Sequence, residues 1–384
     1  MVWESFRSRI KFNRREWAGS FGDIGTDFPL ITGMILASGL DVSSVCVMFG
    51  VMQIIMGFIY GLPMPIQPLK AMAVIVITQK LSPNILYGGG LAIGIAMLIL
   101  SLSGLINWIT KIIPKCVIRG IQFGLGMQLA TLALKDYVHS DGFMGYGLAG
   151  ISFLIILFLL SNRKCPPALL VIFLGIIYAF AFKIDSGALV NSIGFNLPRF
   201  HVPTFQDILM GFLILALPQL PLSIGNSVLA TKQAVTDFFP ERSLSVRKIS
   251  LTYSLMNLIM PFFSGIPVCH GSGGIAGHYT FGARTGGSVV LYGLLYLFLG
   301  LFFNAGFGTV IQLFPKPMLG VILMFEGLAL MRLIRDIKDV KSDLMIAFMV
   351  GMMAVSLPYG YVVGLLVGTI INLFVTKQII RPVE

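Results

Sequence analysis

Gly265-Ile-Pro-Val-Cys-His-Gly-Ser-Gly-Gly-Ile-Ala-Gly-His-Tyr-Thr-Phe-Gly-Ala-Arg284 is a stretch of flexible backbone inside a chain that is otherwise largely apolar. It holds six glycines, two histidines and a proline. Lipid offers no partner to a backbone N–H or C=O group, so such a stretch is tolerated at membrane depth only where protein or a watery cavity surrounds it. The stretch is therefore the first candidate for a binding site.

The composition is that of a polytopic membrane protein. The 384 residues are 56% hydrophobic and 11% charged, whereas a soluble domain carries about 25% charged residues. Basic loops on the cytoplasmic side explain the net charge of +11 better than nucleic-acid binding does, and no nucleic-acid partner is expected. The four cysteines lack metal-binding spacing, and neither HExxH nor a nucleophile–base pair occurs. We therefore expect no metal, no cofactor and no enzymatic activity.

Apolar runs bounded by Gly, Pro and charge clusters predict an all-α fold with fourteen transmembrane elements. Two of these, 66–79 and 270–282, are too short and too polar to cross the membrane alone. The twelve full spans are expected near 19–38, 44–61, 86–109, 117–134, 143–161, 167–182, 207–231, 248–264, 286–306, 317–331, 343–357 and 359–376.

The distribution of basic residues predicts the orientation. With the N-terminus inside, 21 of the 27 Lys and Arg residues fall on the cytoplasmic side, five fall outside and Lys70 lies within the membrane. This predicts a multi-pass protein of the cell membrane with both termini in the cytoplasm, including the tail 377–384. Residues 1–16 are expected to form an amphipathic helix on the membrane surface, and the predicted anchors of this region are Trp3, Phe6, Ile10 and Trp17.

The two halves of the chain resemble each other. Three short motifs recur in the same order about 200 residues apart: Pro29-Leu-Ile-Thr-Gly33 as Pro221-Leu-Ser-Ile-Gly225, Gly61-Leu-Pro-Met-Pro65 as Gly265-Ile-Pro-Val-Cys269, and Ile113-Pro-Lys-Cys-Val-Ile-Arg-Gly120 as Phe314-Pro-Lys-Pro-Met-Leu-Gly320. Seven elements per half is an odd number, so the halves 17–182 and 207–376 enter the membrane from opposite faces. This 7+7 inverted repeat, with interrupted elements at corresponding places, is typical of transporters.

The two short elements predict an anion site. Helix should begin near Pro68 in the first and near Gly271–Ser272 in the second, so that two half-helix N-termini face each other near the midplane. Each end carries about +0.5 charge and free N–H donors, and a dianion at ~5 Å from one end would gain roughly 3 kcal/mol before desolvation. The alternative is that the glycines only permit close helix packing. The predicted substrate-binding residues are Gln67, Pro68, Leu69, Lys70, Gln219, His270, Gly271, Ser272, Gly273 and Gly274.

Several of these side chains allow more than one interpretation. Lys70 lies at the end of its helix that the dipole disfavours for a cation, so it either attracts substrate or pairs with Asp23, Asp27 or Glu326. Gln67 and Ser272 can offer neutral hydrogen bonds. His270 either donates to substrate or caps the second half-helix.

Three acids within the spans are candidate proton carriers. Asp23 and Asp27 lie four residues apart on one helix face, and two buried carboxylates so close should not both ionise readily. Gln219 takes the corresponding place of Asp27 in the second half. Glu326 is the only acid in the interior of the later spans, away from their ends. Intramembrane acids are functional by default, although pairing with Lys70 or a bond between helices remains an alternative.

Four motifs resemble the signatures of the MOT-type molybdate transporters, a family related to the SulP sulfate transporters: Gly22-Asp-Ile-Gly-Thr26, Pro63-Met-Pro-Ile-Gln-Pro-Leu-Lys70, Leu217-Pro-Gln-Leu-Pro-Leu222, and Pro267-Val-Cys-His-Gly-Ser-Gly-Gly-Ile-Ala-Gly277 with Phe281-Gly-Ala-Arg284. The resemblance implies a core domain of elements 1–4 and 8–11 that moves against a gate domain of elements 5–7 and 12–14. It also implies molybdate bound between elements 3 and 10, and no STAS domain is expected here.

We therefore expect a secondary active transporter of a tetrahedral oxyanion, molybdate first and sulfate second, that works by alternating access. A nucleobase or carboxylate transporter of the same fold would be expected to keep an acid in elements 8 and 10, where this chain has none. An anion channel is the other alternative, and counterflow would separate it from a carrier. The expected partners are membrane lipid, coupling H+ or Na+, and a second copy in a homodimer.

Overall fold

The computed structural model describes residues 9–106, 113–159, 166–182, 194–303, 309–311 and 313–377. In the first repeat, the elements are α2 (Arg14–Ser20) with α3 (Ile24–Ser38), α4 (Val42–Tyr60), β1 (Ile66–Pro68) with α5 (Lys70–Gln79), α6 (Pro83–Ser103), α8 (Lys115–Leu132) with the π-helical turn η1 (Ala133–Tyr137), α9 (Gly142–Leu159) and α10 (Pro167–Phe182).

The second repeat follows the same order. One long, irregular helix comprises α12 (Phe205–Gly211), η2 (Phe212–Ala216), α13 (Leu217–Leu222), η3 (Ser223–Leu229) and α14 (Ala230–Phe238). After it come α15 (Val246–Ile259) with η4 (Met260–Phe263), β2 (Val268–His270) with α16 (Ser272–Thr280), α17 (Gly287–Phe302), α19 (Lys316–Arg332) with η5 (Leu333–Ile337), α20 (Lys341–Ser356) and α21 (Gly360–Thr376).

The predicted all-α fold with its 7+7 inverted repeat is confirmed. Six helices in the described part are long and apolar enough to cross a membrane, and shorter apolar helices accompany them. The two short elements contain helices of 10 residues in α5 and 9 residues in α16, which we call the half-helices. The predicted first span differs, because it breaks between Ser20 and Ile24 into α2 and α3.

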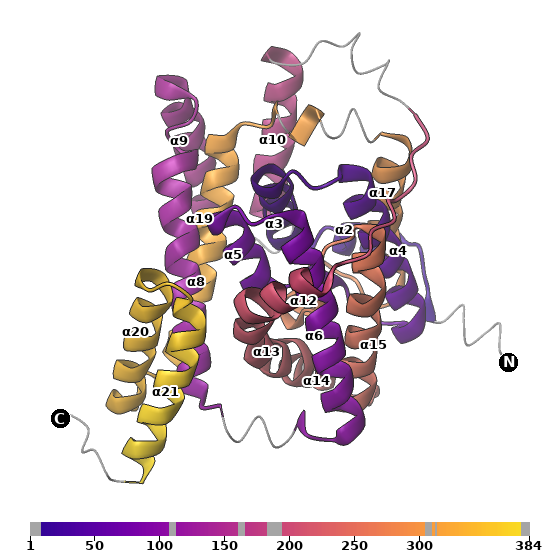
Figure 1. Cartoon of the computed structure of the whole chain (residues 1–384). Coiled ribbons are helices and arrows are strands. Elements are labelled where there is room, and N and C mark those ends of the chain that lie inside the picture. The colour runs from indigo at the N-terminus through magenta and orange to yellow at the C-terminus, as the bar shows by residue number, and fades with distance from the viewer. Residues whose placement is uncertain are drawn as a thin grey trace, which may run out of the picture.

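The helices form two groups, which lie side by side in Figure 1. The core helices are α2–α6 and α12–α17, in which α4 packs on α17 and α6 packs on α12 and α15. The gate helices are α8–α10 and α19–α21, in which α8 packs on α19 and α20. The groups meet where α3 contacts α10 and α19, and where α5 contacts α8. The pairing of elements is the one expected for a core domain and a gate domain.

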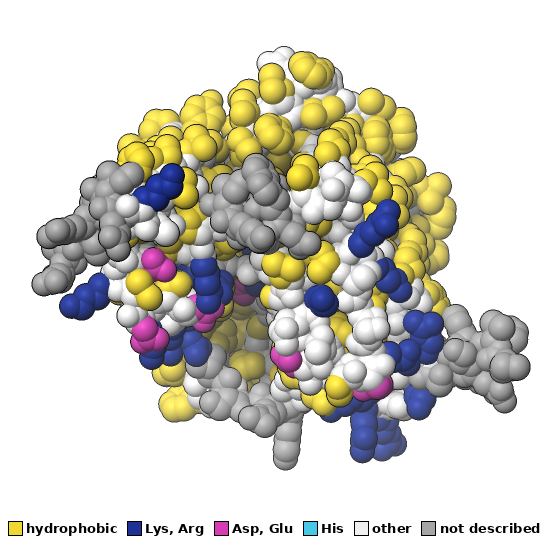
Figure 2. Space-filling view, turned by 90° about the horizontal axis from the view of Figure 1, so that it is seen from below, with side chains coloured by type: hydrophobic (Ala, Val, Ile, Leu, Met, Phe, Trp, Pro, Cys, Tyr) yellow, Lys and Arg dark blue, Asp and Glu magenta, His cyan; other side chains and the backbone are white. Residues whose placement is uncertain are grey.

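The surface of the molecule separates into an apolar belt and a basic face. Large apolar side chains are exposed along the gate helices, including Phe143 at 92% and Phe158 at 80%. Such a belt suits contact with lipid. Seen from below, Lys and Arg side chains surround much of the lower face, and the surface is hollowed between the two groups of helices (Figure 2).

Residues 10–13 differ from the predicted surface helix, and residues 1–8 of that prediction lie outside the described residues. Of the anchors, Trp3 and Phe6 lie outside the described residues, and Trp17 is 55% exposed on α2. Ile10 is buried, because residues 10–13 are not helical and lie against the core helices. Two backbone contacts secure this segment: Gly286 N–H donates to Arg9 O at 3.1 Å, and Lys11 N–H donates to Thr285 Oγ1 at 3.2 Å. Ile10 is therefore a packing residue rather than a membrane anchor.

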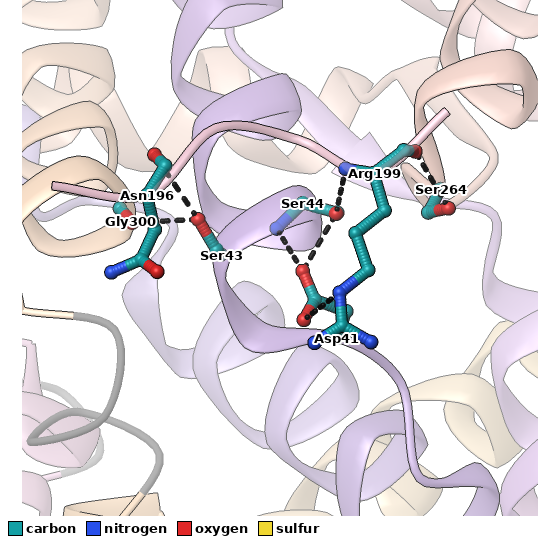
Figure 3. Close-up of polar contacts among 7 residues, drawn as sticks. All are labelled: Asp41, Ser43, Ser44, Asn196, Arg199, Ser264 and Gly300. Carbon is teal, nitrogen blue, oxygen red and sulfur yellow. Dashed lines mark hydrogen bonds and ion pairs between the residues drawn. The ribbon is translucent and has the colours of Figure 1, made fainter. Parts of the chain in front are cut away.

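The connector between the repeats runs in extended conformation across the ends of the core helices (Figure 3). Its Arg199 N–H donates to Ser44 Oγ at 2.9 Å, its carbonyl accepts from Ser264 Oγ at 2.9 Å, and its guanidinium lies 3.2 Å from Asp41 Oδ1. Asn196 N–H donates to Leu301 O at 2.8 Å. The connector therefore joins the ends of α4, η4 and α17, and we assign its described part to the core helices.

Prolines explain the irregular course of the long helix of the second repeat. Pro218 and Pro221 cannot donate backbone hydrogen bonds, which loosens the i→i−4 ladder around them. The ladder widens to π-helical turns on both sides, at η2 and η3. Gln219 lies between the two prolines and is buried, with its side chain directed at the start of α5.

Candidate functional site

The two half-helices begin next to each other. Strands β1 and β2 pair antiparallel, with Ile66 opposite His270 and Pro68 opposite Val268. Leu69 N–H extends the pairing by donating to Pro267 O at 3.0 Å. Because α5 starts at Lys70 and α16 at Ser272, directly after the two strands, their N-termini lie on either side of this small ribbon and arrive from opposite directions.

Each strand is held by an amide side chain from the preceding helix. Gln53 on α4 bonds both backbone groups of Ile66, at 3.0 Å to N and 2.9 Å to O. Asn257 on α15 does the same for Val268, at 2.9 and 2.7 Å. All four residues are buried. The two amides thus satisfy backbone groups that have no water to bond with in the interior.

We expect Gln53→Ala to destabilise the protein by about 2–4 kcal/mol, because it leaves a buried N–H and a buried C=O without partners. The measurement is the thermal unfolding midpoint of the purified protein in detergent. Gln233→Ala is the matched control, because Gln233 is exposed on α14 and its loss should leave the midpoint unchanged. Equal midpoints for the wild type and Gln53→Ala would contradict this role of Gln53.

The N-terminus of α5 is capped by Gln219. Its Oε1 accepts from the backbone N–H groups of Ala71 at 2.9 Å and Met72 at 3.4 Å. Its Nε2 donates to Ser223 Oγ, which in turn bonds the Tyr253 hydroxyl. The expectation of free donors at both half-helices is therefore wrong for these two N–H groups, because the neighbouring helix supplies an acceptor.

The N-terminus of α16 is open. Its N-cap residue is Gly271, which offers no side-chain hydrogen bond. Ser272 is half-buried and Gly273 is exposed, and a Cβ added to Gly273 would meet no atom within 4 Å. The first N–H groups of an uncapped helix carry partial positive charge and lack partners within the helix. Ser272 and Gly273 are therefore the part of this end that can accept an anion, since the Asp23 carboxylate lies beside Gly274.

The first of the predicted acids, Asp23, is bound by Gln67. Gln67 Nε2 lies 2.7 Å from Asp23 Oδ1 and 2.6 Å from Oδ2, and both side chains are buried. A Cβ added to Gly274 would lie 2.5 Å from Asp23 Oδ2, so this carboxylate already lies against the first turn of α16. Asp27 is fully buried, and neither of its carboxylate oxygens has a hydrogen-bond partner in the described part of the chain.

Lys70 pairs with Glu326 rather than with the other two acids. Its Nζ lies 2.7 Å from Glu326 Oε1, and Thr26 Oγ1 lies 3.4 Å from Glu326 Oε2. The Lys70 side chain is 31% exposed and the Glu326 side chain is 9% exposed. Of the two alternatives for Lys70, pairing with an acid is the one that the structure shows, and the pair with Glu326 leaves part of the lysine side chain exposed.

The remaining predicted residues contribute backbone or packing. Pro68 and Leu69 are the last strand residue and the N-cap of α5. His270 does not cap α16, and its Nε2 bonds Thr252 Oγ1 at 2.8 Å on α15. Thr252 also bonds the Tyr60 hydroxyl at 2.6 Å. The prediction that the imidazole caps α16 is therefore wrong, whereas donation to substrate stays a prediction, because His270 Nδ1 has no hydrogen-bond partner in the described residues.

Three structural residues around the site were not predicted. Gln53 and Asn257 are polar residues inside apolar spans. Gln53 precedes Ile66 by as many residues as Asn257 precedes His270, so an alignment of the two repeats could have identified both. Glu16 accepts from the backbone N–H groups of Arg284, Thr285 and Ser288 at 3.0–3.2 Å, and so anchors the segment before α17. No pattern in the sequence pairs Glu16 with that distant segment.

Comparison with known proteins places the chain in a family. Residues 15–129 and 211–330, which include both half-helices, match the family described as "Molybdate transporter of MFS superfamily". The chain is 32% identical to "Molybdate transporter 1" of Arabidopsis thaliana over 95% of this chain and 88% of that protein. It is also 32% identical to "Molybdate transporter 2" of the same plant, over 85% and 80% of the two chains.

Solved structures with low sequence identity share the fold. The transmembrane domain of the cyanobacterial bicarbonate transporter BicA superposes with a TM-score of 0.68 at 16% identity, covering 94% of this chain and 98% of that one. Murine Slc26a9, an anion transporter solved in the inward-facing state, superposes with a TM-score of 0.73 at 12% identity, covering 98% and 70%.

Proposed function

The chain belongs to the molybdate transporter family, and on this premise we propose that it carries a tetrahedral oxyanion, molybdate, across the membrane by alternating access. The observation that carries the proposal is the uncapped N-terminus of α16, with Gly273 exposed and the ammonium group of Lys70 at the start of the neighbouring half-helix. Backbone N–H groups from Gly271 to Gly274 would bind the oxygens, and Lys70 and Ser272 would add a charge and a hydroxyl.

We propose that the basic lower face in Figure 2 is the cytoplasmic face of the cell membrane, with both termini on that side. The excess of Lys and Arg there follows the positive-inside rule. The hollow in that face, between core and gate helices, supports an opening toward the cytoplasm.

Coupling to cations completes the proposal. Entry of a dianion against a negative membrane potential costs about 2.3 kcal/mol per charge per 100 mV, so cations must accompany it. Asp27 is the favoured proton site, because its buried carboxylate has no hydrogen-bond partner in the described residues; Asp23 and Glu326 are the other candidates. Molybdate uptake measured at several external pH values, with and without sodium, distinguishes H+ from Na+.

The site is tested with the double variant Lys70→Ala/Ser272→Leu. In proteoliposomes, we expect the wild type to accumulate molybdate, with sulfate as a competitor, and the double variant to lose binding by at least about 100-fold, since it removes a charged partner and places an apolar side chain at the open helix end. The matched control is Lys80→Ala/Ser82→Leu, which alters exposed residues beyond the other end of α5. Unchanged binding by Lys70→Ala/Ser272→Leu would exclude the proposed site.

A further inference from the structure

The ion pair of Lys70 and Glu326 connects the two groups of helices. Lys70 belongs to α5 of the core helices and Glu326 to α19 of the gate helices. The other ion pairs among the described residues stay within one side: Lys115 and Arg119 pair with Asp336 among the gate helices, and Arg199 pairs with Asp41 at the connector. The Glu326 carboxylate is also within 3.4 Å of Thr26 Oγ1 on α3, so both of its oxygens face core residues.

The same pair lies at the proposed anion site. Lys70 is the first residue of α5, and α5 is joined to the start of α16 through the β1–β2 ribbon. Glu326 thus supplies a carboxylate to the cation that a substrate dianion would need. Removing one charge of such a partly buried pair leaves the other charge without a partner, which is costly. Lys70 must therefore exchange one anion for another rather than stay unpaired.

We propose that Glu326 is an internal competitor for the substrate, and that their exchange on Lys70 releases the gate helices from the core helices. In the empty carrier, Glu326 occupies Lys70 and connects the two groups. A dianion bound at the N-terminus of α16 pairs with the Lys70 ammonium group and displaces the Glu326 carboxylate from it. Movement between the groups is then faster with substrate bound, and the return of the empty carrier, in which Glu326 holds Lys70, is the slower step of the cycle. This inference rests on the proposed anion site.

The decisive variant is Glu326→Gln, which keeps the size of the side chain and removes its charge. We expect it to bind molybdate and sulfate at least tenfold more tightly than the wild type, measured by isothermal titration calorimetry on the purified full chain. If the Glu326 carboxylate only held two helices together, its removal would loosen the site and the affinity for the anion would fall rather than rise. Unchanged or weaker binding by folded Glu326→Gln overturns the inference.

Two further variants keep the test decisive. Glu241→Gln removes an exposed acid outside the site and should leave affinity unchanged, which corrects for the gain in net positive charge. If Glu326→Gln fails to fold, judged by size-exclusion chromatography, Thr26→Val replaces it. That variant weakens the hold on Glu326 and should tighten anion binding two- to threefold; a loss or no change would overturn the inference. If the folded wild type and all variants bind neither anion, the proposed function fails instead.

Discussion

Gln219→Glu is expected to abolish anion binding while the protein stays folded. The new carboxylate can accept from the same N–H groups of Ala71 and Met72, and a negative charge at a helix N-terminus is favourable. Ser223 can donate to it by rotating its hydroxyl. The same charge repels the substrate: at ~8 Å from a dianion and an effective dielectric of ~20, the repulsion is about 4 kcal/mol, or roughly 10³-fold in affinity.

The measurement is molybdate binding by calorimetry, together with the thermal midpoint as a check of folding. Gln233→Glu introduces the same charge on the exposed surface of α14 and should change affinity little, because exposed charges are screened by salt. Undiminished molybdate binding by Gln219→Glu would place the anion elsewhere.

Gly271→Ala is expected to weaken anion binding by about 5- to 150-fold and to lower stability by about 1–3 kcal/mol. The backbone at Gly271 has φ −107° and ψ 120°, which any residue adopts, so the requirement for glycine is steric. An added methyl group would overlap the side-chain amide of Gln67, which is buried and held by Asp23. Either Gln67 or the first turn of α16 must then move.

Gly273→Ala is the matched control for stability, because its methyl group would enter open space two residues further along. We expect its unfolding midpoint to equal that of the wild type, while that of Gly271→Ala falls. Two equal midpoints would show that the contact between Gly271 and Gln67 relaxes at no cost. Radiolabelled molybdate binding to the same preparations gives the affinities.

The parts of the site that sequence patterns predict are those encoded by local backbone chemistry. Pro63, Pro65 and Pro68 disfavour helix before Lys70, and the glycines from Gly271 onward permit the second half-helix to start where it does. Hydropathy and charge asymmetry likewise predict the spans, because each span must satisfy its own backbone in lipid.

The parts that local patterns leave open are partnerships across the repeats. Asp23, Asp27 and Glu326 were equivalent candidates for Lys70, and only the packing of α19 against α3 selects Glu326. The capping of α5 by Gln219 depends on the widened turns of a helix about 150 residues away. Burial of Ile10 depends on its contact near Gly286, which amphipathic periodicity in residues 1–16 does not reveal.

The pairing of β1 with β2 has a consequence for selectivity among anions. Backbone hydrogen bonds join the two strands, and Gln53 and Asn257 hold them to α4 and α15. The distance between the starts of α5 and α16 is therefore fixed. Side-chain substitutions around that gap will change how tightly an oxyanion is held. We propose that the ribbon limits the radius of the oxyanion that fits the proposed site, so that changing this radius requires a change in the length or register of the strands.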